Sequence, residues 1–190
     1  LHLTGITPPL SPICDMNVRN LLRLKPVTLR VSFDVNYRSK LWSPEECRKF
    51  MEEIMKSIDI IFIKEEDLQV IFGLENEDYW EKLAFLQSNY GEDKIYVLTA
   101  GEKGCFVLSK DVSIHQSSFA TEAVDRIGAG DAFVAGFLYG YLSKKNLGEA
   151  ALWGNAMASL KMNVVGDMPV FDRHFVEALV TSSISGKVNR

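Results

Sequence analysis

Cysteine and histidine are scarce in this 190-residue chain, which has three of each. The cysteines show no pair spacing and their number is odd, so neither a disulfide framework nor a C-x-x-C zinc site is indicated. The histidines are also isolated along the sequence, which gives no metal-ligand cluster. Reduced thiols of this kind are typical of a reducing compartment, and we expect a cytoplasmic protein.

Long apolar runs and clustered positive charge are also missing. The best candidate for a membrane span, residues 129–142, contains Asp131 and is shorter than the ~20 residues that such a helix needs. The 21 basic side chains are balanced by 25 acidic ones, and the longest basic cluster is the pair Lys144-Lys145. Nucleic-acid-binding proteins gather Lys and Arg on one face. We therefore expect neither a membrane nor a nucleic acid as a partner.

Strand-like and helix-like segments alternate along the chain. Ser-Pro pairs at Ser11 and Ser43 mark helix starts, and Gly73 marks a helix end. This alternation predicts an α/β fold with a mainly parallel central sheet, and we expect residues 1–190 to form a single domain because no linker or repeat divides them. The predicted strands cover residues 1–6, 29–33, 58–63, 94–99, 105–108 and 112–115, and the later predicted helices cover 65–72, 77–88, 130–144, 147–163 and 172–181.

A glycine-rich helix start is the most informative segment. Gly128 and Gly130 flank Ala129 directly before a long apolar helix. Small residues let the amides of the first helical turn approach an anion, and the helix dipole adds positive charge at that end. The segment therefore predicts a phosphate cradle. It is not a Walker loop, because no G-x-x-x-x-G-K-[ST] pattern is present.

Asp131 stands in the first turn of the same helix. A carboxylate there is often a helix cap, worth roughly 0.5–2 kcal/mol, and that interpretation stays open. Beside a phosphate cradle it would repel the ligand, unless it acts as a base that accepts the proton of an attacking hydroxyl. Farther along, Ala132, Gly136 and Gly140 recur every four residues, which predicts a smooth face for helix packing.

The segment from Asp125 to Gly136 resembles the C-terminal signature of the ribokinase-like sugar kinases, with Arg126 where many members have threonine. By this resemblance Asp131 is the catalytic base, and the residues from Gly128 to Gly130, including Ala129, form the anion hole. The resemblance implies a three-layer sandwich around the parallel sheet. It also implies ATP and Mg²⁺ as cofactors and leaves a monovalent-cation requirement open.

Further segments agree with the family in the same order. Residues 99–104 are similar to its T-x-G-x-x-G nucleotide turn, although a plain hairpin turn has the same pattern. Asn155 resembles a position that lies beside the adenine. The ATP-binding residues implied by the resemblance are Asn36, Thr99, Gly101, Lys103, Gly104 and Asn155.

The metal segment departs from the family. Residues 64–67 read Lys-Glu-Glu-Asp where members often have N-x-x-E, which organises Mg²⁺ through water. An acidic first helical turn is the ordinary alternative. A carboxylate of Glu66 or Asp67 could still hold a metal-bound water.

Substrate choice depends on residues 33–42, which resemble those of 2-keto-3-deoxygluconate kinases and, more loosely, those of fructokinases. Arg38 lies just past the carboxyl end of a predicted strand, where open α/β sheets place their ligands. Its planar fork can hold a carboxylate, which favours a sugar acid, although an ion pair with Asp34 is the alternative. The resemblance also places Asp34 and Asp167 at the substrate.

The predicted reaction is the ATP-dependent phosphorylation of a sugar-acid hydroxyl, 2-keto-3-deoxygluconate to its 6-phosphate. The alternatives are a fructokinase or other ketose kinase, and a non-catalytic nucleotide- or sugar-binding module. Family members carry an N-terminal portion with a β-sheet lid, and no segment here reads as that lid. We therefore expect the C-terminal part of a longer enzyme, poorly active alone, whose full-length form could be a homo-oligomer.

Overall fold

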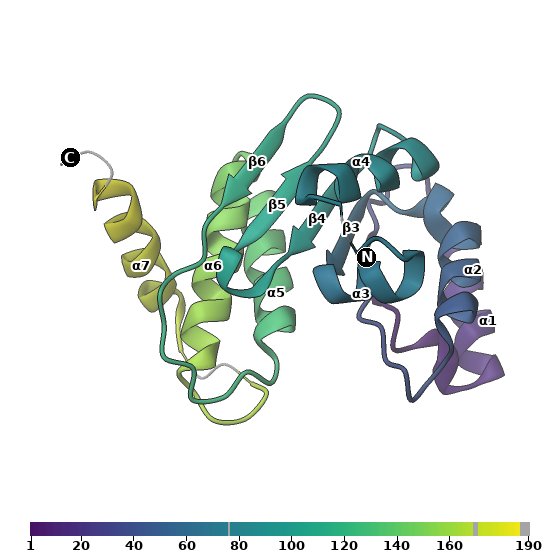
Figure 1. Cartoon of the computed structure of the whole chain (residues 1–190), viewed down its shortest axis with the longest axis horizontal. Helices are drawn as coiled ribbons and strands as arrows, with labels where there is room; N and C mark the ends of the chain where they lie inside the picture. Colours follow the sequence, from purple (N-terminus) through teal and green to yellow (C-terminus); the bar gives the residue numbers. More distant parts are fainter. Residues whose placement is uncertain (76, 169–170, 187–190) are drawn as a thin grey trace. The chain divides into compact units, whose positions relative to one another are not determined.

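A computed structural model of the chain describes residues 1–75, 77–168 and 171–186 (Figure 1). The chain divides into two compact units. The first holds residues 1–100 and 106–113, and the second holds residues 101–105 and those from 114 onward. The prediction of a single domain stays a prediction. In the part of the chain just specified, no helix has the length and apolar character needed to cross a membrane.

The strands form one six-stranded sheet in the order of the sequence, β1 to β6. The strands are β1 (His2–Thr4), β2 (Ser32–Asp34), β3 (Ile60–Lys64), β4 (Ile95–Thr99), β5 (Cys105–Leu108) and β6 (Ser113–Gln116). Strands β1 to β4 are parallel, and Phe33 of β2 lies opposite Leu3 and Ile61. The turn between β5 and β6 is closed by backbone hydrogen bonds between Ser109 and Val112 (2.9 and 3.4 Å). The predicted mainly parallel α/β sheet is confirmed.

Three of the four α-helices described in the first unit begin where the sequence predicts, and the fourth begins later. The four are α1 (Pro12–Leu24), α2 (Pro44–Ile54), α3 (Glu65–Phe72) and α4 (Tyr79–Tyr90), with short 3-10 turns η1 (Pro8–Leu10) and η2 (Met55–Ser57). Ser11 caps α1 by accepting a hydrogen bond from the Cys14 amide (3.2 Å), and Ser43 forms a capping box with Glu46 at α2. Helix α4 begins two residues later than predicted, because the Asp78 side chain caps it by accepting from the amides of residues 80 and 81.

The core of the first unit lies on one face of the sheet. Phe33, Ile61 and Tyr96, which are neighbours across three strands, all belong to it, together with buried residues from helices α1 to α4. Sequential parallel strands joined by right-handed crossovers place these helices on the same face. Ile60 and Phe62 point to the other face and are also buried, as the continuous apolar run predicts. The carboxyl ends of β2, β3 and β4 therefore meet at one edge.

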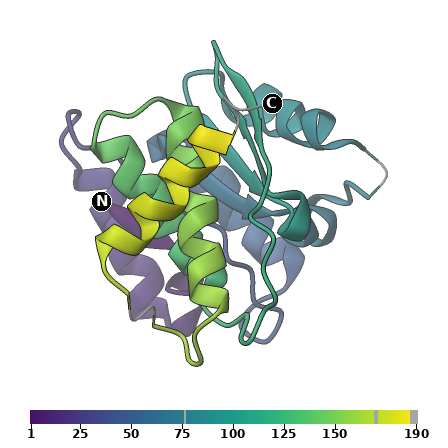
Figure 2. The same cartoon turned by 90° about the vertical axis from the view of Figure 1, so that its left-hand side faces the viewer.

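The second unit contains η3 (Gly101–Lys103) and the helices α5 (Ala129–Leu142), α6 (Leu147–Met162) and α7 (Arg173–Gly186). The predicted smooth face of α5 packs on α6. A Cβ atom on Gly136 would lie 2.5 Å from the Trp153 carbonyl oxygen, and one on Gly140 would lie 2.8 Å from Ala150 Cα. Figure 2 shows the yellow α7 crossing the green helices, and its Val176 and Val180 pack in one apolar cluster with residues of α6.

Candidate active site

The turn before α5 contains the residues predicted to cradle an anion, and its backbone geometry is specific to glycine. Gly128 has φ +77°, and a Cβ atom on it would lie 2.4 Å from the carbonyl oxygen of Asp167, so only glycine fits. The Ala129 amide donates to the Arg126 carbonyl (3.2 Å). Within the described residues, nothing accepts a hydrogen bond from the Gly130 amide. This amide at the positive end of α5 is therefore available to a ligand.

Asp131 is exposed at the third position of α5. Neither a hydrogen bond nor an ion pair joins its carboxylate to any residue of the described part of the chain. The contacts therefore do not support the interpretation of Asp131 as a helix cap. They leave an unengaged carboxylate one residue after the Gly130 amide.

Asp125 and Lys161 fix the backbone around this turn. The Asp125 carboxylate accepts hydrogen bonds from the amides of Ile127 and Gly166, both 2.9 Å long. These two donors, with a smaller contribution from the Lys161 ammonium, lower the pKa of Asp125. Lys161 is fully buried, and its Nζ atom donates to the carbonyls of Asp125 (3.0 Å) and Val164 (3.2 Å). Sequence reasoning missed Lys161, because a lysine in the last turn of a helix usually only complements the helix dipole.

The predicted nucleotide turn is a 3-10 turn, closed by a hydrogen bond from the Gly104 amide to the Gly101 carbonyl (3.0 Å). Lys103 is exposed, and its carbonyl oxygen lies 2.8 Å from His115 Nε2. Asn155 is buried, and its Nδ2 atom donates to two carbonyls at and after the end of β6 (2.9 and 3.1 Å). Its side-chain nitrogen therefore holds the β6 segment in place.

In the first unit, Asn36 stands out at the carboxyl end of β2. It is only 4% exposed and has a left-handed φ of +39°. Its Oδ1 atom is buried and has no hydrogen-bond partner in the described structure. An unsatisfied buried acceptor costs about 1–3 kcal/mol, and residues held in such backbone conformations cluster at ligand sites. A ligand donor that reached Oδ1 would remove this cost.

Arg38 follows Asn36 on the same loop and is exposed. Its Nη1 atom donates to the Tyr37 carbonyl (3.3 Å), and none of the ion pairs in the described residues includes Arg38. Asp34, at the end of β2, is buried. The ion pairs of the described residues do not include the alternative pair of Arg38 with Asp34, so the guanidinium keeps its capacity to bind an anion.

The two candidate metal residues after β3 differ in their surroundings. Asp67 is buried, and its Oδ2 atom accepts a hydrogen bond from the Tyr37 amide (3.2 Å). Burial raises the pKa of Asp67, and the hydrogen bond opposes that shift. Glu66 is exposed in the first turn of α3 and is the member left to face solvent. In the described chain, no group of three or more His, Cys, Asp or Glu side chains could hold a metal ion.

The structure thus gathers the candidate residues in two groups, one in each unit. The first unit holds Asp34, Asn36, Arg38, Glu66, Asp67 and Thr99 at the carboxyl ends of β2, β3 and β4. The second unit holds Gly101, Lys103, Gly104, Gly128, Ala129, Gly130, Asp131, Asn155 and Asp167.

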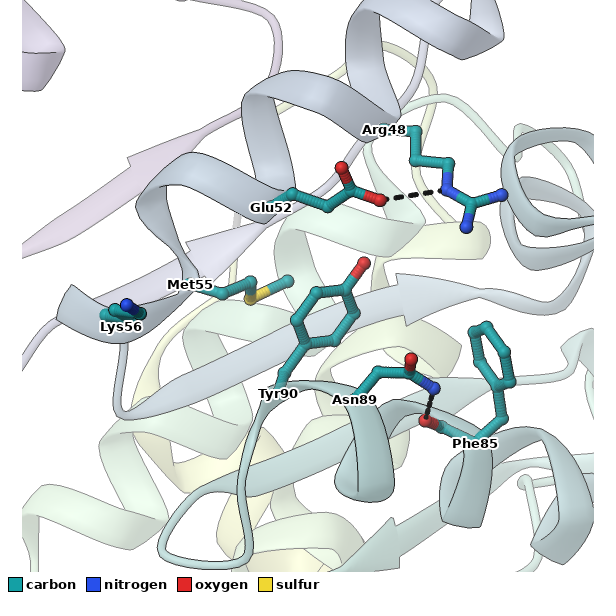
Figure 3. Close-up of a pocket in the computed structure, with 7 residues that line it drawn as sticks. All are labelled: Arg48, Glu52, Met55, Lys56, Phe85, Asn89 and Tyr90. Atoms are coloured by element: carbon teal, nitrogen blue, oxygen red, sulfur yellow. Dashed lines mark hydrogen bonds and ion pairs between the residues drawn. The ribbon is translucent and has the colours of Figure 1, made fainter.

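A pocket of about 340 Å³ lies elsewhere in the first unit, between α2, η2 and α4 (Figure 3). Its lining includes the Arg48–Glu52 ion pair (3.0 Å) and Tyr90, whose pKa is raised to about 12 mainly by burial. Segments η2 and α4 directly precede β3 and β4, so this pocket is at the opposite edge of the sheet from the candidate residues. None of the predicted site residues lines it.

Comparison with known proteins places the chain in a family. Residues 1–171 match the pfkB family of carbohydrate kinases. A 2-dehydro-3-deoxygalactonokinase of Haloferax volcanii is 32% identical over 186 residues, which are 97% of this chain and 58% of that protein. The chain therefore spans little more than half the length of this relative.

Solved structures agree with this match. The 2-dehydro-3-deoxygluconokinase of Thermotoga maritima superposes with a TM-score of 0.85 at 27% identity, over 95% of this chain and 59% of that one. A double-mutant fructokinase of Vibrio cholerae O395, bound to fructose, ADP and a potassium ion, superposes with a TM-score of 0.81, also at 27% identity and with the same coverage. The predicted sugar-kinase fold is confirmed. The chain belongs to the pfkB family of carbohydrate kinases.

Proposed function

We propose that this chain is the C-terminal, nucleotide-binding part of a longer enzyme that transfers the γ-phosphate of ATP to a hydroxyl of a 2-keto-3-deoxy sugar acid. The observation that carries the proposal is the unengaged Asp131 carboxylate beside the free Gly130 amide at the start of α5. A module that only binds nucleotide has no need of that carboxylate. This argues against the non-catalytic alternative.

In the proposed reaction, Asp131 accepts the proton of the substrate hydroxyl as its oxygen attacks the γ-phosphorus. The bond from phosphorus to the bridging oxygen breaks, and ADP leaves. The amides of the Gly128–Gly130 turn stabilise the charge on the transferring group, as an oxyanion hole does. With 2-keto-3-deoxygluconate, the product is its 6-phosphate.

Within the first unit, side chains near the carboxyl ends of the strands offer groups that suit these ligands. Asn36 offers an unsatisfied buried acceptor, which suits an amine or hydroxyl donor of the nucleotide or sugar. Mg²⁺, when bound, supplies neutralisation of the phosphate charge, and exposed Glu66 is the residue that we propose to hold it through water. Asp67 is left out of this proposal, because its carboxylate is buried against the Tyr37 amide.

Arg38 is proposed as the residue that selects a sugar acid. Its exposed guanidinium acts on the Asp67 carboxylate only at longer range and forms none of the ion pairs of the described residues. A substrate carboxylate can therefore bind to it directly. Two similar proteins named for keto-deoxy sugar acids support this class. The fructokinase neighbour supports the ketose alternative, because it is as identical in sequence as the gluconokinase.

The test uses the full-length protein with ATP and Mg²⁺. Asp131→Asn should lower kcat by at least about 100-fold, the lower end of what a positioned general base contributes. The matched control is Glu149→Gln, which removes a carboxylate from the same helical position of α6 and should leave kcat unchanged. An Asp131→Asn enzyme with wild-type kcat would remove the proposed base.

Substrate choice is tested with Arg38→Ala on 2-keto-3-deoxygluconate, 2-keto-3-deoxygalactonate and fructose. Loss of one charge-assisted hydrogen bond should lower kcat/KM for the sugar acids by roughly 10–100-fold and change fructose turnover little. An equal loss on all three sugars would show that Arg38 does not read the carboxylate. A wild-type preference for fructose would favour the ketose kinase.

A further inference from the structure

Lys161 is a buried cation with an unusual set of partners. It is 0% exposed, and its ammonium donates to two backbone carbonyls, those of Asp125 (3.0 Å) and Val164 (3.2 Å). None of the ion pairs of the described residues includes it. Lys82, the other lysine that is buried among the described residues, is instead paired with the Glu65 carboxylate (3.1 Å). The Asp125 carboxylate interacts with this ammonium only at longer range, beyond ion-pair distance. Burying an ammonium without a direct anionic partner is costly, so its presence here calls for an explanation.

The two carbonyls belong to the two segments that form the anion turn. Asp125 begins the turn that leads to Gly128, and Val164 begins the segment whose residue Asp167 touches Gly128. The Asp125 carboxylate already joins these segments through the amide of Gly166 (2.9 Å). Lys161 joins them a second time, through carbonyl groups. The Asp125 carboxylate thus accepts hydrogen bonds from backbone amides, and the Lys161 ammonium donates to backbone carbonyls. We call these two side chains and their four contacts the clasp.

We propose that Lys161 is a built-in monovalent cation, a positioning residue that holds these two carbonyls together and so keeps the Gly128–Gly130 turn in its anion-binding shape. Carbonyl oxygens that point at one place repel one another, and a compact cation such as potassium or an ammonium group satisfies them. The lysine supplies that charge covalently. The anion as the ligand of the turn rests on the proposed function, whereas the clasp itself rests on the contacts of Lys161.

The first consequence concerns the wild-type chain. Because the cation place is occupied, potassium chloride, ammonium chloride and choline chloride at equal concentration should give the same thermal unfolding midpoint. A specific rise of the midpoint with potassium or ammonium would show a cation place that Lys161 does not fill, and it would overturn the proposal. This measurement needs no variant.

The second consequence concerns Lys161→Ala, which opens a space the size of a small cation. In choline chloride, the Ile127 and Gly166 amides should exchange their hydrogens roughly tenfold faster than in the wild type, the factor for one lost charge-assisted hydrogen bond. Ammonium chloride should restore slow exchange. The matched control is Lys82→Ala, in which ammonium should not change the exchange of these two amides.

Unchanged exchange in Lys161→Ala, or equal restoration by choline, would overturn the proposal. If that variant does not fold, Lys161→Met keeps the volume of the side chain and should show the fast exchange without ammonium rescue. Activity of the full-length enzyme separates the two claims. If ammonium restores slow exchange in Lys161→Ala but the full-length protein phosphorylates no sugar, the clasp is supported and the kinase proposal is rejected. If the full-length enzyme is active but exchange in Lys161→Ala is unchanged, the kinase proposal is supported and the clasp is rejected.

Discussion

Gly128→Ala is the substitution whose cost the structure defines best. The residue has φ +77°, and left-handed backbone costs a residue with a side chain about 1–2 kcal/mol. The alanine variant has a lower conformational entropy in its unfolded state, which offsets about 0.4–1 kcal/mol of this cost. The new Cβ would also lie 2.4 Å from the Asp167 carbonyl oxygen. Forcing a group into filled space typically costs about 1–3 kcal/mol. We expect the variant to lose about 2–4 kcal/mol of unfolding free energy, most of it from this contact.

Gly101→Ala is the control that measures the cost of a left-handed backbone without a close contact of the new Cβ atom. Gly101 lies in the same unit with φ +54°, and a Cβ on it would have nothing within 4 Å. It should therefore stay within about 1 kcal/mol of the wild type. Urea unfolding followed by amide exchange in peptides of α5 and α6 measures both variants. Equal stability of the two variants, within about 0.5 kcal/mol, would refute the close approach between Gly128 and Asp167.

Three further outcomes follow from buried polar groups. Asn155→Ala leaves two carbonyls of the β6 segment without their donor and should lower the stability of the second unit by about 1–3 kcal/mol in the same urea experiment; no loss would mean that water replaces the amide. The pKa of Asp67 is raised by burial, so its contribution to stability is present at low pH and is lost as pH rises above the ordinary carboxyl range. Asp67→Asn should therefore raise the unfolding midpoint at pH 7 relative to the wild type but not at pH 3, and a stabilisation that is independent of pH would contradict this. A thiol reagent should label only Cys14 quickly in the native chain, because Cys47 and Cys105 are buried with pKa values of about 12; Cys14→Ser should abolish the fast phase.

Local signals allowed much of the fold to be predicted. Helix α3 has the predicted bounds because its acidic first turn and Gly73, with φ +72°, define both ends within the segment itself. Helix α7 runs past its predicted end at Thr181 to Gly186, although residues 182–186 are mostly small and polar. In this segment the residue types predict the end of the helix, but α7 continues to Gly186.

The candidate site was predictable where a motif encodes it and not where tertiary contacts decide. The Gly-Ala-Gly-Asp segment predicts a tight turn followed by a helix, and Gly128 with φ +77° directly precedes α5 because both features depend on local backbone conformation. Its anion-binding role stays a prediction. The roles of Asp67 and Lys161 depend on partners 30 and 36 residues away. Neither spacing is visible in a pattern. Asp67 therefore read as a metal residue, although it binds the Tyr37 amide, and Lys161 read as an ordinary helix end.

Phosphate transfer by the full-length protein tests the central claim most directly. ATP, Mg²⁺ and either 2-keto-3-deoxygluconate or fructose are supplied to the wild type and to Asp131→Asn, and the sugar phosphate is measured. We expect turnover that favours the sugar acid and a loss of at least about 100-fold in kcat in the variant. Wild-type kcat in Asp131→Asn, or no sugar phosphate from the wild-type enzyme, would contradict the account.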